Sequence, residues 1–394
     1  MTWPSVALGQ VAEINPREAT RPADSEEIAF VPMAELDATR ATTSRGSVRA
    51  FAEVSKGYTI FHDADVLVAK ITPCFENNKI GQAHLSRPTG VGSTEFHVVR
   101  PRNSALDPRY VLHFLRQDGI RAQGERRMTG SAGQRRVPAA FLAGLEVPLP
   151  PLAEQRRIAA ILDKADALRA MREQAVVLSK EAIESLLGGV SRDAPRVRTT
   201  LIQAGVDFET GKNIVGTSSN EHTTNRVIKV SAVSRGQFDP REVKPLPANY
   251  SPPASHEIRS GDILFGRASG SLDLLGATVR VRQVSRNLYL PDKVWRAKIT
   301  PSALITPEYL LGLLQSAPFR SYIRHRASGA AGVRNIGKAA VLSYQFDLPE
   351  LSVQLEYARK RNSLMRHLDA QREQSTGIAN LFASLQSRAF TGEL

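Results

Sequence analysis

The chain has 394 residues, of which 42% are hydrophobic, so it is long enough to form two or more domains that each bury a core. Its single cysteine, Cys74, excludes an intramolecular disulfide and a cysteine-rich zinc site. The opening MTWPSVALGQVAEINPREA lacks the basic stretch and apolar run of a secretory signal, and no run of about 18 apolar residues follows it. We therefore expect a cytoplasmic protein without a membrane segment.

The net charge of +13 comes from 52 basic and 39 acidic residues. Such an excess favours a polyanionic partner, because cations that contact phosphates release counterions, although a merely solvated basic surface accounts for composition alone equally well. Residues 152–187 carry six basic and six acidic side chains, and residues 351–388 carry six and three. Most of the positive charge therefore lies in the other two segments.

The sequence repeats itself once, which indicates a two-copy architecture. Four blocks recur in the same order with offsets between 197 and 199: DVLVAK at Asp65 as DILFGR at Asp262, LDPRYVLHFL at Leu106 as ITPEYLLGLL at Ile305, GSAGQRRV at Gly130 as GAAGVRNI at Gly329, and LPPL at Leu149 as LPEL at Leu348. Each copy contains a mixed segment, a proline-rich boundary and a long helical pattern. We place the mixed segments at residues 1–150 and 191–350, and the helices at 151–190 and 351–394.

The mixed segments have the pattern of α+β domains. Short runs such as YTIF, DVLVAK and FHVVR have the alternating or β-branched character of strands and are separated by glycine, proline and asparagine. PRYVLHFLRQ and PEYLLGLLQS are typical of short amphipathic helices that open with proline. Tyr110 and Tyr309 occupy equivalent places on the apolar faces of these helices, where we expect them to be core residues.

Residues 152–187 contain no proline or glycine, and they predict one amphipathic helix of roughly 54 Å. Its apolar stripe comprises Ile158, Ile161, Leu162, Ala165, Leu168, Ala175, Leu178, Ala182 and Leu186. A lone helix of this length needs a partner, and the second copy offers Leu351, Leu355, Leu368, Ile378, Leu381, Phe382 and Leu385, with an interruption at Gly377. The expected fold class is α+β, with two pseudo-repeated domains separated by two long antiparallel helices packed as a coiled coil. The alternative is that each helix packs only on its own domain.

Several long stretches carry a family resemblance. LPPLAEQRRIAAILDKADAL at residues 149–168 and LFASLQSRAFTGEL at residues 381–394 resemble the specificity subunit of type I restriction-modification systems. AKITPCFENNKIG at residues 69–81 and GSTEFHVVRP at residues 92–101 are similar to a common kind of target-recognition domain in that family. LPELSVQLEYARKRNSL, at the start of the second helix, departs from the family's AEQRRI pattern.

The resemblance implies a DNA-binding subunit with no active site of its own. It implies that each target-recognition domain reads one half of a bipartite site on double-stranded DNA. It also implies that the helices dock methyltransferase subunits, and that restriction motor subunits join through the complex. No cofactor or metal is expected in this chain.

Reading bases requires hydrogen-bonding side chains on exposed loops, typically arginine or lysine for guanine and asparagine or glutamine for adenine. The first domain offers Lys70, Thr72, Asn77, Asn78, Lys79, Thr94, Gln134, Arg135 and Arg136. The second offers Arg267, Ser269, Arg334 and Asn335. The equivalent residues Lys70 and Arg267 fit a repeated structural salt bridge as well as a repeated DNA contact. The small residues of GSAGQRRV and GAAGVRNI fit either close approach to phosphate or an ordinary turn.

Two other functions remain open in the sequence. A nuclease or methyltransferase acting alone would need a site such as a metal cluster at Asp63, Asp65 and Lys70, but the second copy has Ser260 in place of Asp63. GVGSTEF at Gly90 lacks the third glycine of a dinucleotide fingerprint, and no HExxH spacing occurs. A helical protein adaptor without DNA specificity is the second alternative.

The length of the first helix predicts a limit on the DNA site. A helix of roughly 54 Å bounds the distance between half-site centres at about 15 base pairs, at about 3.4 Å of rise per pair. Mapping the bases methylated by the assembled complex measures this distance. Half-sites that lie further apart would contradict the spacer model.

Overall fold

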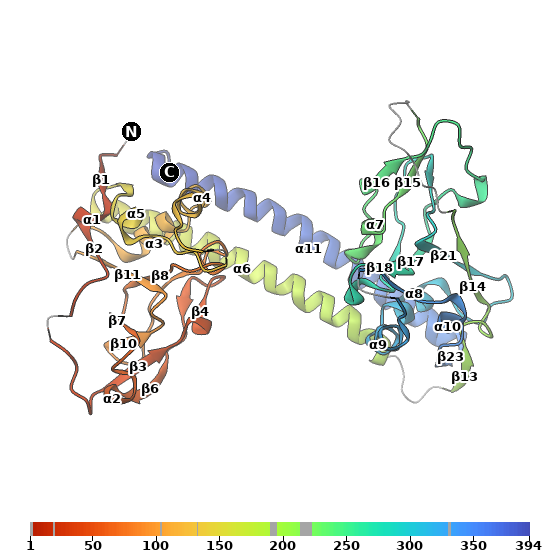
Figure 1. Ribbon diagram of the computed structural model, residues 1–394, viewed down its shortest axis with the longest axis horizontal. Helices are drawn as coiled ribbons and strands as arrows, with labels where there is room; N and C mark the ends of the chain where they lie inside the picture. Colours follow the sequence, from red (N-terminus) through yellow and green to blue (C-terminus); the bar gives the residue numbers. More distant parts are fainter. Residues whose placement is uncertain are drawn as a thin grey trace. The chain divides into compact units, whose positions relative to one another are not determined.

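The computed structural model describes residues 3–18, 20–102, 105–131, 133–189, 195–212, 223–329 and 332–394. The chain divides into two compact units, one formed by Met1–Val176 with Ala370–Leu394 and the other by Val177–Asp369. The predicted boundary at residues 190 and 191 lies outside the described residues. Each unit is a mixed α+β body that includes part of both long helices, as the predicted fold class requires (Figure 1).

The first unit contains two main sheets. One has six strands in the order β2-β11-β8-β9-β5-β4, and the other has four in the order β6-β3-β10-β7. Their bounds are β2 Ala12–Ile14, β3 Glu27–Val31, β4 Leu36–Asp37, β5 Thr42–Thr43, β6 Ser47–Ala50, β7 Thr59–His62, β8 Val66–Ala69, β9 Ile80–Gln82, β10 Thr89–Gly92 and β11 Phe96–Pro101, with β1 Ser5–Ala7 paired to β12 Glu146–Pro148. The helices are α1 Leu8–Val11, α2 Phe51–Val54, α3 Pro108–Leu115, α4 Asp118–Arg127 and α5 Ala139–Ala143.

The second unit repeats the central sheet of the first. The order β14-β21-β17-β19 corresponds to β2-β11-β8-β9, and α8, α9 and α10 follow as α3, α4 and α5 do. The bounds are β13 Arg196–Thr200, β14 Val206–Thr210, β15 Arg226–Ile228, β16 Val243–Pro245, β17 Ile263–Gly266, β18 Ala268–Ser269, β19 Thr278–Arg280, β20 Leu288–Tyr289, β21 Val294–Ile299, β22 Arg334–Asn335, β23 Gln345–Pro349, α7 Ser231–Ser234, α8 Pro307–Gln315, α9 Ala317–Arg326 and α10 Lys338–Leu342. The predicted internal repeat is therefore present in three dimensions.

Strand β8 shows why these segments became central strands. Val66 and Val68 face the core that contains the helices, whereas Leu67 and Ala69 face the core between the two sheets. Alternate side chains of a strand point to opposite faces, so a continuous apolar run suits a strand that is covered on both sides. Its counterpart β17 divides its residues between two cores in the same way.

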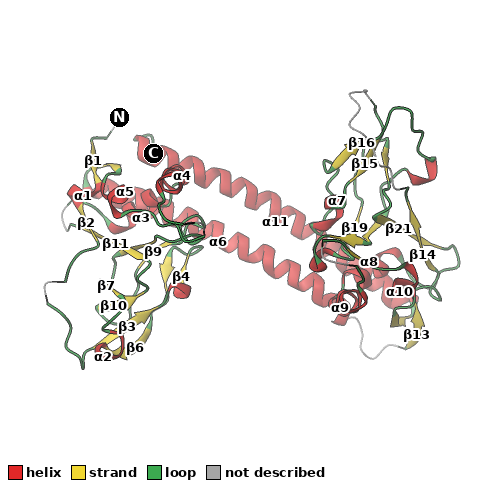
Figure 2. Cartoon of the chain, in the orientation of Figure 1, coloured by secondary structure: helices red, strands yellow, loops and turns green. Residues whose placement is uncertain are grey.

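Two long helices, α6 Leu152–Gly189 and α11 Leu351–Thr391, pack together, as predicted (Figure 2). Within the first unit, Ile158 and Leu162 of α6 share a core with Phe382 and Ala389 of α11. The Arg157 guanidinium donates to the carbonyl oxygen of Leu394 over 2.7 Å. The start of α6 thus lies beside the end of α11, which makes the pair antiparallel there. Both helices also pack on the first domain, so the alternative that each helix packs only on its own domain was wrong.

The predicted stripe of α11 was partly wrong. Leu351, Leu355 and Leu381 are 58%, 49% and 56% exposed, and Leu178 of α6 is also exposed. Polar residues instead occupy buried positions of α11, namely Arg361, Gln371 and Gln386. Gln386 donates to the carbonyl of His113 (3.0 Å), and Arg361 donates to the Gln315 amide oxygen (2.9 Å). A buried polar side chain is tolerated where such a bond replaces water.

A buried glutamine connects each long helix to its domain in the same way. The Gln155 amide nitrogen donates to the carbonyls of Ala105 and Pro150, both over 2.9 Å, and its oxygen accepts the Asp107 N–H over 2.8 Å. In the second unit, Gln354 makes the same three bonds to Leu304, Pro349 and Thr306. These glutamines lie 199 residues apart, so this part of AEQRRI is retained in the second helix.

Replacing Gln155 with leucine is expected to lower the free energy of unfolding by roughly 2–4 kcal/mol, because three buried backbone groups lose their partner. Urea denaturation measures the effect. Gln174→Leu, at an exposed position of the same helix, is the matched control and should change stability by less than about 0.5 kcal/mol. Equal stability of the two variants would show that Gln155 does not connect the helix to the domain.

Candidate nucleic-acid interface

Three distant segments of the first domain meet at the end of its central sheet. We call residues 70–72, 94–95, 129–131 and 133–136 the first junction. The Lys70 N–H donates to the Glu95 carbonyl (2.9 Å), and the Lys70 carbonyl accepts the Val137 N–H (2.9 Å). Thr129 and Arg136 pair like the two sides of a hairpin and exchange two backbone bonds of 3.0 and 2.8 Å. This backbone frame places the Lys70, Thr72, Thr94 and Arg136 candidates in one region.

The second domain builds the same frame. We call residues 267–269, 292–293, 328–329 and 332–335 the second junction. The Arg267 N–H donates to the Lys293 carbonyl, and the Arg267 carbonyl accepts the Ile336 N–H, both over 3.0 Å. The backbones of Ser328 and Asn335 exchange two hydrogen bonds of 2.9 and 2.8 Å. Arg136 and Asn335 therefore occupy equivalent backbone positions in their hairpins.

Glycine is required where each hairpin begins. Gly130 and Gly329 have φ values of +121° and +114°, which favour glycine over other residues. An added Cβ would lie 2.9 Å from the Gln134 carbonyl oxygen at Gly130 and 2.3 Å from that of Val333 at Gly329. Turn geometry thus accounts for glycine at these two positions, and close approach of the loops to phosphate stays a prediction.

The Arg136 side chain is held by a carboxylate. Its Nε lies 2.9 Å from Oε2 of Glu95, and its Nη2 lies 2.7 Å from Oε1. The hydrogen bond from Arg136 holds the pKa of Glu95 below its usual value. Glu95 directly follows Thr94 in GSTEFHVVRP, one of the stretches that carry the family resemblance, and the structure places its carboxylate against Arg136.

The other candidates of the first domain divide into exposed and structural side chains. Thr94, Gln134, Arg135 and Asn77 are exposed, while Lys70, Thr72 and Lys79 are partly buried. The Thr72 hydroxyl donates to Glu76 over 2.8 Å. Asn78 points inward: it has a φ of +53°, and its amide donates to the Arg116 carbonyl over 3.3 Å.

The second junction uses its charged residues differently. Arg267 donates from Nε to the Asp292 carbonyl (2.7 Å), and its guanidinium lies 5.9 Å from the centroid of the Trp295 ring. Ser269 is buried, and its hydroxyl accepts the Ser271 N–H. Arg334 is exposed and donates to the Gly329 carbonyl, and Asn335 is partly buried. Arg267 also forms an ion pair with the Asp292 carboxylate (3.8 Å). Its counterpart Lys70 lies near the carboxylate of Glu95, but that carboxylate is bound by Arg136.

Exposed cations precede both hairpins. Helix α4 ends in Arg126 and Arg127, and the last turn of α9 contains Arg324 and Arg326. They lie outside the four blocks matched by sequence, which explains why they were not selected. In both domains, a helix whose last turn is basic precedes the glycine of the repeated block. This shared pattern could have identified these residues from the sequence. Each junction is thus bordered by positive charge suited to phosphate.

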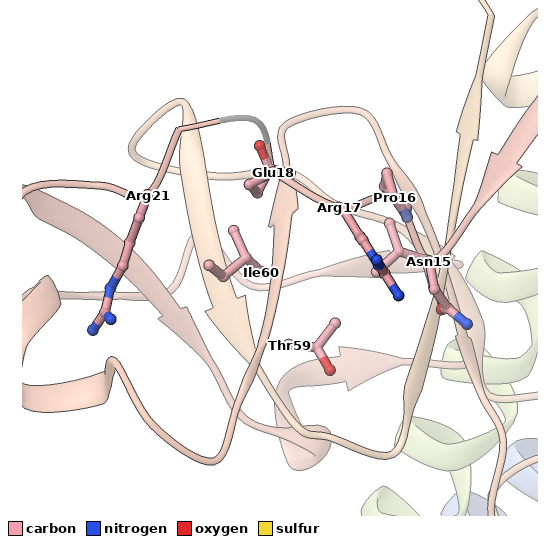
Figure 3. A pocket seen from close by; sticks show the side chains of 8 residues that line it. Asn15, Pro16, Arg17, Glu18, Arg21, Thr59 and Ile60 are labelled. Atoms are coloured by element: carbon pink, nitrogen blue, oxygen red, sulfur yellow. The ribbon is translucent and has the colours of Figure 1, made fainter.

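A buried histidine supports the first hairpin from behind. Nε2 of His97 lies 2.8 Å from the Val137 carbonyl, which can only accept, so this nitrogen carries the proton. Nδ1 then accepts from the Asn15 amide nitrogen over 3.0 Å. Asn15 also lines a hollow of about 340 Å³ with Arg17, Glu18, Arg21, Thr59 and Ile60 (Figure 3). Burial lowers the pKa of His97.

The acidic residues considered for a nuclease have structural contacts. Asp63 accepts the Leu85 N–H over 2.8 Å, and Asp65 binds Arg100 at 2.8 Å. Among the described residues, no group of three or more histidine, cysteine, aspartate or glutamate side chains could hold a metal ion.

None of the helices in the described part of the chain is long and apolar enough to span a membrane.

Acid should weaken the first unit through His97. Below pH 6.5, the usual pKa of histidine, this side chain is protonated in the unfolded chain but stays neutral longer in the folded one. The free energy of unfolding therefore decreases as the pH is lowered. Between about pH 7.5 and pH 5.5 the loss attributable to His97 is at most about 1.4 kcal/mol. His97→Gln keeps a donor for Val137 and should show a smaller decrease in thermal unfolding temperature. An identical pH dependence for both proteins would contradict this assignment.

Comparison with known proteins agrees with this geometry. Residues 1–177 match the family described as type I restriction modification DNA specificity domain. The type I restriction enzyme EcoEI specificity subunit of Escherichia coli is 27% identical over 456 residues, covering 90% of this chain and 76% of that protein. The EcoAI specificity subunit, also of Escherichia coli, is 38% identical over 191 residues, which cover 47% of this chain and 32% of that protein.

The fold is shared with a solved structure along its full length. The type I restriction-modification system S subunit from M. genitalium has a TM-score of 0.57 and 11% identity, covering 99% of this chain and 96% of that one. Its likeness concerns the fold, and the sequence matches concern the family. Residues 1–177 thus match the DNA specificity domain of this family, and most of the chain is similar to type I restriction enzyme specificity subunits.

Proposed function

We propose that this chain binds double-stranded DNA sequence-specifically as the specificity subunit of a type I restriction-modification complex. Residues 1–150 and 191–350 each read one half of a bipartite site, and the helical segments 151–190 and 351–394 separate them. The observation that carries this proposal is the duplicated junction, in which one backbone frame presents different polar side chains in each domain. Duplicate frames with unlike side chains suit the recognition of two unlike half-sites.

The proposed DNA contacts are the exposed or partly exposed side chains of the two junctions and the adjoining loop. They are Lys70, Thr72, Asn77, Lys79, Thr94, Gln134, Arg135 and Arg136 in the first domain, and Arg267, Arg334 and Asn335 in the second. We leave out Ser269, which is buried, and Asn78, whose amide is turned inward toward the Arg116 carbonyl. Arg126 and Arg127 join the set as phosphate contacts, since cations beside a reading loop position the duplex.

The long helices are the proposed docking sites for methyltransferase subunits. Apolar side chains remain exposed on them: Leu168, Met171 and Leu381 in the first unit, and Val177, Leu178, Leu351 and Leu355 in the second. Exposed apolar residues grouped on a helix suit a protein partner, because association removes them from water. Restriction motor subunits would join through the assembled complex.

The chain itself is the recognition component and not the catalytic one, as the relatives' designation of specificity subunit states. Methylation and cleavage would use groups from the partner chains. Cellular DNA and these partners would meet the chain in the cytoplasm, which is the location we propose.

Co-expression with its methyltransferase subunits, followed by mapping of methylated bases on random DNA, tests the function. We expect a bipartite motif with an unspecified centre that disappears when this chain is omitted. A stable complex without methylation would favour an adaptor, and an unchanged motif from the partner alone would remove the recognition role.

Exchanging residues 1–150 for the corresponding domain of another family member tests the division between the domains. We expect one half-site to change and the other to remain, because each frame is built within its own domain. The methylated motif of the hybrid complex measures the outcome. A change in both half-sites would show that the domains do not read independently.

A further inference from the structure

Within the described residues, the hydrogen bonds of Arg136 occupy three of its five N–H donors. Nε and one N–H of Nη2 face Glu95, and Nη1 donates to the Gln134 carbonyl over 3.1 Å. A guanidinium has five N–H donors, so one remains on each terminal nitrogen. Two parallel donors at the end of an arginine match the O6 and N7 acceptors of guanine in the major groove.

The ion pair is better suited to orienting Arg136 than to stabilising the fold. The side chains of Arg136 and Glu95 are 42% and 24% exposed, and ion pairs in such surroundings contribute little to stability. Three bonds to two fixed groups nevertheless restrict the rotation of a long side chain. An arginine that is already oriented loses less entropy when it binds a base.

Asn335 holds the same backbone position in the second hairpin. Ala268 and Ser269 pair with Asn335 and Arg334, matching the contacts of Ile71 and Thr72 with Arg136 and Arg135. Within the described residues, the Asn335 side-chain amide forms no hydrogen bond, so its oxygen and nitrogen are both available. The N–H of an amide can donate to N7 of adenine while the amide oxygen accepts from its N6 amino group.

We propose that positions 136 and 335 are the equivalent base-reading positions of the two domains. Arg136, positioned by Glu95, reads a guanine in one half-site, and Asn335 reads an adenine in the other. This proposal rests on the proposed DNA-recognition function and deepens it by assigning a base to each side chain. Arg135 and the cations at the end of α4 contact phosphate around the first of these bases.

The test uses the complete complex with its methyltransferase subunits, methylating a library in which each recognised position is randomised. In Arg136→Asn, we expect the preference for guanine at one position of one half-site to fall on the order of 10- to 100-fold, with adenine gaining. Asn335→Arg should make the converse change in the other half-site. A wild-type complex without a bipartite motif would reject the proposed function itself, whereas a wild-type motif retained by both variants would overturn only this assignment.

Two further variants separate base reading from charge and from loss of folding. Arg136→Lys keeps the positive charge but not the paired donors, so guanine preference should fall while the salt dependence of binding stays unchanged. Arg135→Asn makes the same chemical change as Arg136→Asn one residue away, and should weaken binding to all sequences and reduce the salt slope by about 1. Wild-type guanine preference in Arg136→Lys, or an equal loss on every sequence in Arg136→Asn, would make Arg136 a phosphate contact.

Glu95→Gln tests the positioning role. The amide keeps one bond to Arg136 but removes the charge, so guanine should remain preferred with a smaller ratio over the other bases. The second half-site serves as an internal control because its frame has Lys293 at this place. An unchanged ratio in Glu95→Gln would exclude Glu95 from orienting Arg136.

Discussion

The recognition surface depends on a backbone constraint. In each domain, the residue at the end of a central strand donates to one neighbouring segment and accepts from the hairpin. Backbone groups supply these bonds, so the frame does not depend on which side chains project from it. The same positions can therefore carry Lys70, Glu95 and Arg136 in one domain and Arg267, Lys293 and Asn335 in the other. A duplicated scaffold can thus present two different chemical surfaces.

Polar residues connect the long helices to the domains with a defined register. Gln155 and Gln354 each satisfy three backbone groups at a helix start, and Gln386 reaches the carbonyl of His113. Apolar packing tolerates sliding along a helix, whereas a buried amide is satisfied in one place only. These bonds define the position of each domain on the helix segment that it contacts.

The charges of the first junction combine attraction with orientation. Arg126, Arg127 and Arg135 are exposed and suit a duplex backbone of any sequence, because phosphates are present in every sequence. Arg136 instead shares its donors with Glu95 and Gln134. An arginine oriented by hydrogen bonds presents its donors in one direction, which suits the recognition of a base. In the proposed binding mode, affinity and specificity therefore have separate sources in adjacent residues.

The sequence alone determined the large features of the protein. Repeated blocks predicted two α+β domains, periodicity predicted both long helices, and the apolar pattern correctly assigned Tyr110 and Tyr309 to the core. Long position-rich motifs also carried the family resemblance. These features could be predicted because local patterns of polarity, glycine and proline encode secondary structure and its repetition.

Only the tertiary structure decided which side chains are available at the junctions. Asn78 looked suitable for adenine, yet its backbone conformation turns the amide toward the Arg116 carbonyl. Leu351 and Leu381 fitted an apolar stripe, but Arg361 and Gln386 occupy buried positions because distant groups satisfy them. Glu95 and Arg136 are 41 residues apart in sequence. Hydrogen bonds between such distant segments depend on how the chain folds back, which no local pattern specifies.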